Sequence, residues 1–252
     1  MLGLLGGGGA NGAEGARMSD KEPVHLTYFS DLLCIWAYAA EARVNEVRQK
    51  FGARIVITER ICSIFHDTEQ HIGRGWKARG SWSGFNTHLA EVAAKFDHIV
   101  LHPELWVKVR PASSMGPHLF IKAAKRVERR LSLPLFENGG HARLPSEHLA
   151  WQFRLAFFRD GRDIASYKVQ REVATSLGLP CDEIELEIEN GSAFGSLGED
   201  IEVCKRFDIK GSPTFSLNEG RQKLYGNVGY HVIEANIQEL LRKPTASEAS
   251  WC

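Results

Sequence analysis

Residues 29–38 read Phe-Ser-Asp-Leu-Leu-Cys-Ile-Trp-Ala-Tyr, and the rest of the chain can be read outward from them. The apolar run at residues 24–29 predicts a strand, and the amphipathic pattern at residues 36–51 predicts a helix. Cys34 is therefore expected at a strand-to-helix junction, where free amides and the helix dipole stabilise an anion. Because such a position can lower a thiol pKa from about 8.5 to about 3.5–7.5, Cys34 is the first candidate nucleophile.

A second stretch, far along the chain, bears on the same question. Residues 207–215 read Phe-Asp-Ile-Lys-Gly-Ser-Pro-Thr-Phe, so Pro213 opens an apolar strand after a turn. Proline is tolerated at the first position of a strand because no ladder hydrogen bond needs its missing N–H there. A single cysteine at a junction is more often a structural core residue, so the chemical interpretation depends on both stretches.

Together the two stretches resemble the thioredoxin superfamily in its DsbA-like branch, over about residues 24–241. The resemblance implies an α/β thioredoxin fold (βαβ…ββα) with a large all-helical insertion. Within the branch, the first stretch is similar to the FrnE-like group and to the 2-hydroxychromene-2-carboxylate isomerase and kappa-class glutathione transferase group. FrnE-like proteins usually read Ser-Asp-x-x-Cys-Pro-Trp-Cys-Tyr, whereas here Ile35 replaces the proline and Ala37 replaces the second cysteine.

The resemblance also implies the members of the site. In the family, the backbone before a cis proline pairs with an extended thiol peptide and aligns its sulfur with the active cysteine. Carried over to this chain, the motif positions are Cys34, Trp36 and Ala37, and the substrate-binding positions are Asp31, Ser212, Pro213 and Thr214.

Two further substrate contacts are predicted in loops. His66 follows the second strand, in a loop that lines the substrate cleft in the related families; an exposed loop histidine is the simpler alternative. Asn227 lies in the Gly-Asn-Val turn before the last helix, where the kappa-like group holds the γ-glutamyl end of glutathione. That turn lacks the acidic residue often found there, but an asparagine at a helix start still offers hydrogen bonds to a carboxylate.

Ala37 limits the chemistry that Cys34 can perform. A dithiol enzyme forms a mixed disulfide with its substrate, and its second cysteine then releases the product. With Ala37 at that position, an external thiol such as glutathione has to release the adduct. The sequence leaves open a resolving role for Cys62 or Cys204.

The pattern of breakers and periodic segments predicts four parts of the chain. Residues 1–23 form a Gly-rich flexible segment, in which Met18 is an alternative start, and residues 243–252 form a polar tail. The thioredoxin-like domain comprises residues 24–62 plus 191–242, with a second strand at residues 54–60. Residues 63–190 form the inserted domain, in which everything from about residue 71 onward is expected to be helical, with helices at residues 82–96, 112–130, 145–159 and 164–177.

Composition sets limits on the partners. The formal net charge is zero and the hydrophobic fraction is 43%, which favours neither nucleic acid nor anionic membranes as partners. No apolar run approaches the roughly 20 residues of a bilayer-spanning helix. The five cysteines include no Cys-x-x-Cys pair, and the histidines show no metal-ligand spacing, so we expect a reducing, cytoplasmic setting and no metal.

Three functions are compatible with these observations. The first is a monothiol thiol–disulfide oxidoreductase that uses Cys34 on a thiol or disulfide substrate, with glutathione as co-substrate. The second is a kappa-like glutathione-dependent transferase or isomerase that acts on a small electrophile. The third is a thioredoxin-fold binding module without turnover. Homodimers are common in this branch, so the resemblance leaves a homodimer open.

Overall fold

The computed structural model describes residues 22–138 and 141–242 of the chain. Its centre is a four-stranded sheet in the order β2-β1-β5-β6. β1 (Val24–Ser30) and β2 (Ile55–Ile61) run parallel. β5 (Thr214–Leu217) is antiparallel to β1, and β6 (Gln222–Tyr225) is antiparallel to β5. The predicted βαβ unit and the closing strand pair are therefore confirmed.

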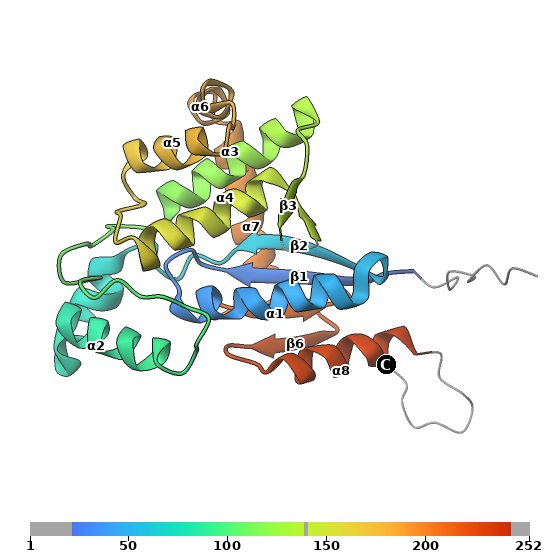
Figure 1. The fold of residues 1–252 in the computed structure, drawn as a ribbon, viewed down its shortest axis with the longest axis horizontal. Coiled ribbons are helices and arrows are strands. Elements are labelled where there is room, and N and C mark those ends of the chain that lie inside the picture. The colour runs from blue at the N-terminus through green and yellow to red at the C-terminus, as the bar shows by residue number, and fades with distance from the viewer. Residues whose placement is uncertain (1–21, 139–140, 243–252) are drawn as a thin grey trace, which may run out of the picture.

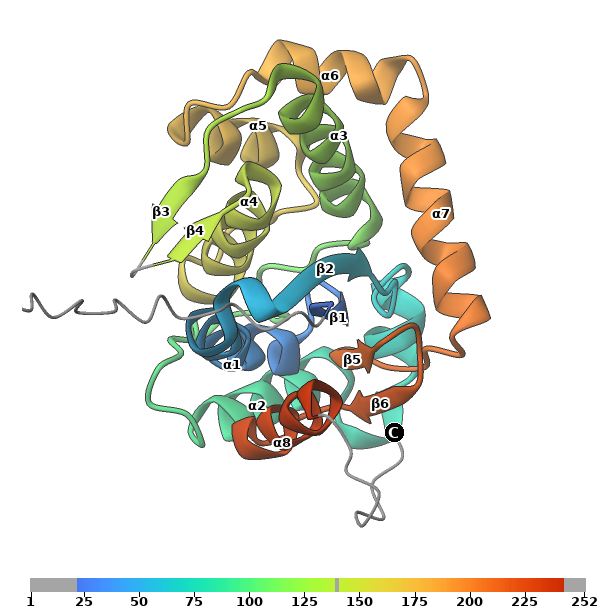
Figure 2. The same ribbon diagram turned by 90° about the vertical axis from the view of Figure 1, so that its right-hand side faces the viewer.

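Two helices cover one face of this sheet. α1 (Ile35–Phe51) connects β1 to β2 through a short turn of 3-10 helix (Gly52–Arg54), and α8 (Tyr230–Leu241) closes the chain. Alternate residues of β1 point to this face, as the period of a strand requires. They share one core with a stripe of each helix, made up of Val24, Leu26, Tyr28, Ala40, Val44, Val47, Ile233 and Ile237 among others. Figure 2 shows α7 (Ser192–Arg206) running along the opposite side of the sheet.

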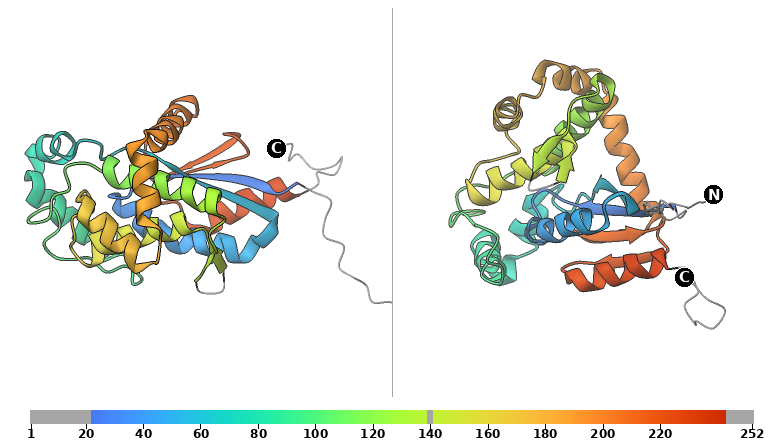
Figure 3. Two further views of the ribbon diagram at one scale, coloured as in Figure 1. Left: turned by 90° about the horizontal axis from the view of Figure 1, so that it is seen from above. Right: turned by 45° about the vertical axis from the view of Figure 1, so that its right-hand side comes forward.

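The rest of the chain forms a helical block with its own, larger core. Figure 1 shows α3 to α6 stacked on one side of the sheet and α2 near the start of α1. Seen from another side, α7 joins that block to the sheet, and α8 lies beneath the sheet (Figure 3). The elements are a π-helix (Glu69–Arg74), a 3-10 turn (Lys77–Arg79), α2 (Ser81–Ala93), α3 (Met115–Leu131), α4 (Pro145–Arg154), a second π-helix (Leu155–Arg159), α5 (Tyr167–Ser176) and α6 (Cys181–Glu189).

The expectation of an all-helical stretch from residue 71 to residue 190 is wrong in two places, the first being residues 94–114, which form irregular turns between α2 and α3. β3 (Phe136–Asn138) and β4 (His141–Arg143) form a small antiparallel hairpin between α3 and α4. The physical reason is the length of the strands, because three residues are too few to show the alternation by which a strand is recognised in a sequence. The hairpin brings Arg143 back toward α1, where its guanidinium donates to Glu41 Oε1 at 2.7 Å.

Several sequence predictions are not tested here. Residues 1–21 and 243–252, and with them Met18 and Cys252, lie outside the described residues. The division into a thioredoxin-like part (24–62 plus 191–242) and an inserted part (63–190) stays a prediction, because α7 packs against β2 as well as α3 and α6. In the described part of the chain, none of the helices has the length and apolar character needed to cross a bilayer.

Candidate active site

Cys34 lies at the junction between sheet and helix. It is the N-cap residue of α1, in extended conformation (φ −85°, ψ 115°), and its carbonyl accepts from the amides of Ala37 at 3.1 Å and Tyr38 at 3.0 Å. The Cys34 thiol donates to the Ser212 carbonyl at 3.1 Å. The Ser212–Pro213 peptide bond is cis, and the Cys34–Ser212 hydrogen bond joins residues that lie 178 positions apart in the sequence.

Burial controls the ionisation of this thiol. Only 5% of Cys34 is exposed, and removal from water raises the thiol pKa, as does the nearby Asp31 carboxylate. Hydrogen bonds from Ser212 and from the Ala37 amide act in the opposite direction, but burial is the larger effect. The lowered pKa expected from the helix N-terminus is therefore wrong for this structure, in which burial holds the pKa of Cys34 above its usual value.

Asp31 organises the turn that carries Cys34. It is fully buried, and its Oδ1 accepts from the Leu33 amide at 2.9 Å while its Oδ2 accepts from the Phe65 amide at 2.9 Å and the Ser114 hydroxyl at 2.8 Å. Burial opposes its ionisation. The hydrogen bond and charge of His118, with the two amides, nevertheless hold the pKa of Asp31 below its usual value.

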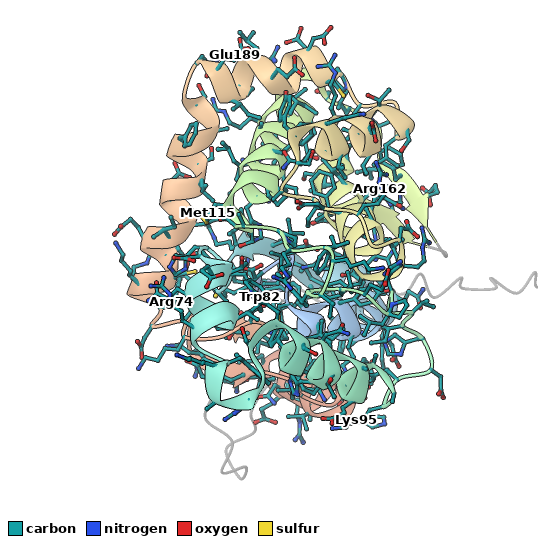
Figure 4. The ribbon with its side chains drawn as sticks, turned by 90° about the vertical axis from the view of Figure 1, so that its left-hand side faces the viewer. Arg74, Trp82, Lys95, Met115, Arg162 and Glu189 are labelled. Carbon is teal, nitrogen blue, oxygen red and sulfur yellow. The ribbon has the colours of Figure 1, made fainter. Side chains whose placement is uncertain are left out.

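Sequence reasoning missed His118 and Ser114. His118 is 2% exposed, and its Nε2 lies 3.6 Å from Asp31 Oδ1. Both residues come from the beginning of α3. Figure 4 places Met115, the first residue of that helix, between the upper block marked by Glu189 and the lower segment marked by Trp82. The only local signal was their spacing, since positions i and i+4 share one helix face.

The remaining predicted positions frame the turn, and the amides of Ala37 and Trp36 also hydrogen-bond the Cys34 sulfur. Thr214 Oγ1 donates to the Gly211 carbonyl at 2.8 Å and so fixes the cis-proline turn. Trp36 is half-buried, with its ring edge-on to Phe96 at 6.3 Å. Ala37 is fully buried, and its carbonyl accepts from the Tyr28 hydroxyl at 3.4 Å.

The two loop residues lie in different surroundings. His66 is exposed, and its Nδ1 lies 3.0 Å from the Ser63 carbonyl, which corresponds to the simpler alternative of a loop histidine. Asn227 is also exposed, but its neighbour Gly226 donates its amide to the Pro213 carbonyl at 2.8 Å. The loop before α8 therefore adjoins the cis-proline turn.

A small cavity lies beside this site. It has a volume of about 40 Å³, room for water rather than a substrate, and Cys34 is not among its lining residues. Leu32, His118, Lys122, Glu147 and Arg154 line it with others. Among the residues that the structure describes, no group of three or more His, Cys, Asp or Glu side chains is placed to hold a metal ion.

Comparisons with known proteins agree on the fold. Residues 25–238 match the family model of the DSBA-like thioredoxin domain. A probable DsbA oxidoreductase from Streptomyces coelicolor aligns over 88% of this chain and 92% of its own, with 16% identity and a TM-score of 0.64. The cytosolic disulfide reductase DsbM from Pseudomonas aeruginosa, solved with GSH, aligns over 85% and 99%, with 17% identity and a TM-score of 0.59. A 2-hydroxychromene-2-carboxylate isomerase aligns over 86% and 96%, with 16% identity and a TM-score of 0.57. No curated protein matches.

Proposed function

The chain belongs to the DSBA-like thioredoxin family, and we propose that within it this protein is a monothiol thiol–disulfide oxidoreductase with Cys34 as nucleophile. One observation carries the proposal. The Cys34 thiol lies at the N-terminus of α1 and donates to the carbonyl that precedes the cis proline. This arrangement presents one sulfur and one strand-like backbone segment to a disulfide substrate.

Ionisation of Cys34 changes what the Ser212 backbone can do. When the Cys34 thiol is protonated, it donates a hydrogen bond to the Ser212 carbonyl. A thiolate has no S–H to donate, so the carbonyl becomes free to accept an N–H from an extended substrate. The hydrogen bonds of the Ser212 side chain and of the Ala37 amide favour the thiolate, which offsets part of the effect of burial. Formation of the nucleophile and binding of the substrate backbone are thus coupled.

Glutathione or another external thiol supplies the electrons that close the catalytic cycle. Ala37 carries no sulfur, so the motif itself cannot release a mixed disulfide by intramolecular attack. Glutathione fits the resemblance to the kappa-like group, and the DsbM neighbour is named as solved with GSH. We place its γ-glutamyl end at Asn227, because the Gly226 amide ties that loop to the Pro213 carbonyl.

The test is reduction of a glutathionylated peptide by glutathione, with Cys34→Ser compared with Cys181→Ser. Cys181 is buried in the helical block, where its thiol lies 3.3 Å from Thr175 Oγ1. We expect the first variant to fall to the uncatalysed rate and the second to keep the wild-type rate. Activity in the Cys34→Ser variant would overturn the assignment.

A second function is favoured by one specific observation. The raised pKa of Cys34 keeps it a hydrogen-bond donor at neutral pH. A protonated thiol of this kind could stabilise a bound glutathione thiolate that attacks a small electrophile, as in the transferase or isomerase alternative. Glutathione-dependent conversion of an electrophile without any disulfide reduction would select this function. If the protein showed neither disulfide reduction nor conversion of an electrophile, the third function, a binding module without turnover, would be selected.

The setting completes the proposal. We place the protein in the cytoplasm, acting on a thiol, disulfide or small electrophilic substrate, either as a monomer or as a homodimer. The lack of any Cys-x-x-Cys pair supports a reducing compartment, and the DsbM neighbour is itself named as cytosolic. Reduced thiols at Cys34 and Cys181 in protein alkylated inside intact cells would support this placement, and a stable disulfide there would contradict it.

A further inference from the structure

Cys62 lies close to the active turn, although it is 28 residues further along the chain. β1 and β2 are parallel neighbours with Ser30 opposite Ile61, so the segments that follow them leave the same edge of the sheet. The Cys62 amide donates to the Ser30 carbonyl at 3.0 Å. Its thiol, which is 3% exposed, donates to the Gly211 carbonyl at 3.7 Å.

Cys34 and Cys62 therefore border the same dipeptide. The Cys34 thiol donates to the carbonyl of Ser212, and the Cys62 thiol donates to the carbonyl of Gly211, the residue before it. The charge of Cys34 is also among the influences that raise the pKa of Cys62, after its hydrogen bond to Cys204 and its burial. Both thiols thus contact the backbone that leads into the cis proline.

A third thiol adjoins the second. Asp200 and Cys204 lie one turn apart on α7, and both hold the end of β2. Asp200 Oδ2 accepts from the Ile61 amide at 2.9 Å, and the Cys204 thiol donates to the Ile61 carbonyl at 3.2 Å. That carbonyl belongs to the peptide bond that enters Cys62. Each thiol carries one proton, so a hydrogen bond between the two side chains forms when Cys204 is a thiolate and Cys62 donates to it instead of to Gly211.

The surroundings of the pair give its members different roles. Their shared hydrogen bond lowers the pKa of Cys204, and the nearby Arg60 and Lys122 act in the same direction against burial and Asp200. The same hydrogen bond raises the pKa of Cys62. Cys204 is also the more accessible of the two, being half-buried. Cys204 is thus suited to be the thiolate that attacks a sulfur at Cys62.

We propose that Cys62 and Cys204 form a second redox couple that takes the resolving role left vacant by Ala37. The proposal rests on the function proposed above. The carrying observation is geometric: three thiols follow one another around the cis-proline turn and the end of β2, from Cys34 to Cys62 to Cys204.

The steps balance as three exchanges. The Cys34 thiolate attacks a substrate disulfide, forms a mixed disulfide and releases one substrate thiol. The Cys62 thiol gives its proton to the Cys204 thiolate and attacks the Cys34 sulfur, which breaks the bond to the substrate and releases the second substrate thiolate, and this thiolate takes that proton from Cys204. The Cys204 thiolate then attacks the Cys62 sulfur, which frees Cys34 and leaves a disulfide between residues 62 and 204. Two electrons and two protons have passed to the substrate, and two molecules of an external thiol return them by becoming a disulfide.

The experiment follows the three sulfurs directly. The full-length, fully reduced protein is mixed with one equivalent of oxidised glutathione, quenched with acid over a time course, alkylated and digested without reduction. In wild type we expect a cross-linked peptide pair that contains Cys62 and Cys204, with Cys34 alkylated. The Cys62→Ser variant should retain a glutathionyl group on Cys34, decaying slower by about tenfold or more. The Cys204→Ser variant should stop as a cross-link between Cys34 and Cys62.

The controls separate this proposal from the proposed function. Cys181→Ser should behave as wild type, since the hydrogen bonds of Cys181 stay within the helical block. A persistent glutathionyl adduct at Cys34 in wild type, with Cys62 and Cys204 both alkylated, would overturn the couple and leave the monothiol function intact. Oxidation of the pair at the wild-type rate in Cys34→Ser would also overturn the relay. Because the wild-type digest already decides, the outcome does not depend on the variants folding.

Discussion

Asp31 and Cys34 form one electrostatic unit at the centre of the site. The carboxylate contributes to the raised pKa of the thiol, after burial. We expect Asp31→Asn to lower the pKa of Cys34, because the substitution removes a buried negative charge beside it. At pH 7 the variant should therefore react faster with iodoacetamide than wild type, since the thiolate is the reactive form. The rate constant for alkylation of Cys34, followed by mass spectrometry from pH 6 to pH 10, tests this.

The same substitution should also change stability. The folded pKa of Asp31 is depressed, so its contribution is present above its unfolded pKa and is lost as pH falls through the folded value. We expect Asp31→Asn to cost roughly 1–3 kcal/mol at pH 7, because an amide cannot accept all the donors that surround it, and the gap to wild type should narrow in acid. Asp182→Asn, at a side chain that is 90% exposed, is the control for both measurements. Equal alkylation rates in all three proteins would contradict the coupling.

Ala37 is the residue at which this chain departs most from a dithiol enzyme. Its side chain is fully buried in the first turn of α1, three positions after Cys34. We expect Ala37→Cys to form a disulfide with Cys34 when oxidised, at a cost of about 1–3 kcal/mol for the extra sulfur in a packed site. Non-reducing digestion after oxidation would detect the cross-link. If the introduced thiol and that of Cys34 were both alkylated, the geometry of the motif would not be that of a dithiol site.

Much of this site could be predicted from the sequence, and the rest depended on packing. Two short stretches contain Asp31, Cys34 and Ser212, and the residue pattern of each stretch predicts its own local structure. His118 could not be predicted, because its spacing from Ser114 shows only that the two share a helix face and not that this face turns toward Asp31. The direction of the Cys34 pKa was wrong for the same reason: a helix N-terminus is visible in a sequence, but the burial that outweighs it is not.

The elements themselves follow from periodicity, except at the hairpin. The predicted helix at residues 145–159 is α4 followed by a π-helical turn, and Pro145 begins it as the first-turn preference of proline suggests. β3 and β4 are three residues each, too short to show the alternation that identifies a strand. The Asn-Gly-Gly sequence at residues 138–140 indicated a break in the helical pattern, but it did not indicate a pair of short strands.

The start of α4 carries a buried acid whose titration should be measurable. Glu147 lies next to Glu59 and shares Arg48 with it, at 3.1 Å from Arg48 Nη2. Burial and then the charge of Glu59 raise the pKa of Glu147 to about 7. Between the unfolded pKa of about 4.5 and this value, the folded state holds a proton that the unfolded state has released. Stability should therefore fall as pH rises through that window.

We expect Glu147→Gln to flatten this dependence, because glutamine is neutral throughout. The difference between pH 5 and pH 8 in wild type should be at most on the order of 3 kcal/mol, and the variant should be the more stable protein at pH 8. Urea unfolding at both pH values measures this. Glu183→Gln, at an exposed side chain of α6, should leave the wild-type profile unchanged. A profile that stays as steep in Glu147→Gln would assign the titration to another group.

At the scale of the whole molecule, buried charges join the helical block to the thioredoxin-like sheet. Arg143 of β4 is 1% exposed and donates to Glu41 of α1. Arg154 at the end of α4 lies 3.7 Å from the same carboxylate and donates to the Ser30 hydroxyl at 2.8 Å. Two cations of the block thus meet one acid of α1, and one of them also holds the last residue of the strand that leads to Cys34. These contacts hold the helical block close to Cys34, which is buried in the core of that block.

Removal of one member of this cluster should therefore destabilise the whole protein. We expect Arg143→Met to cost about 3–5 kcal/mol, because Glu41 remains buried and loses its 2.7 Å partner, while Arg154 lies 3.7 Å away. Arg130→Met is the matched control: the same substitution removes an exposed guanidinium that pairs with Glu183 and Glu187, and Arg126 still pairs with Glu187, so the cost should be small. Guanidinium unfolding followed by tryptophan fluorescence compares the two.

The number of steps in the unfolding transition shows whether the helical block and the thioredoxin-like sheet unfold together. Tryptophans lie in both the block and the first turn of α1, so fluorescence reports on each. If the buried cluster holds the block to the sheet, wild type should unfold in one transition, and Arg143→Met should shift it as a unit or separate a first step in which the block detaches. Detachment would expose Cys34 and lower its pKa, because burial is the main cause of its present value. Faster alkylation of Cys34 in Arg143→Met under native conditions, with no change in Arg130→Met, is therefore the result that this architecture requires, and equal rates would show that the block does not control access to the thiol.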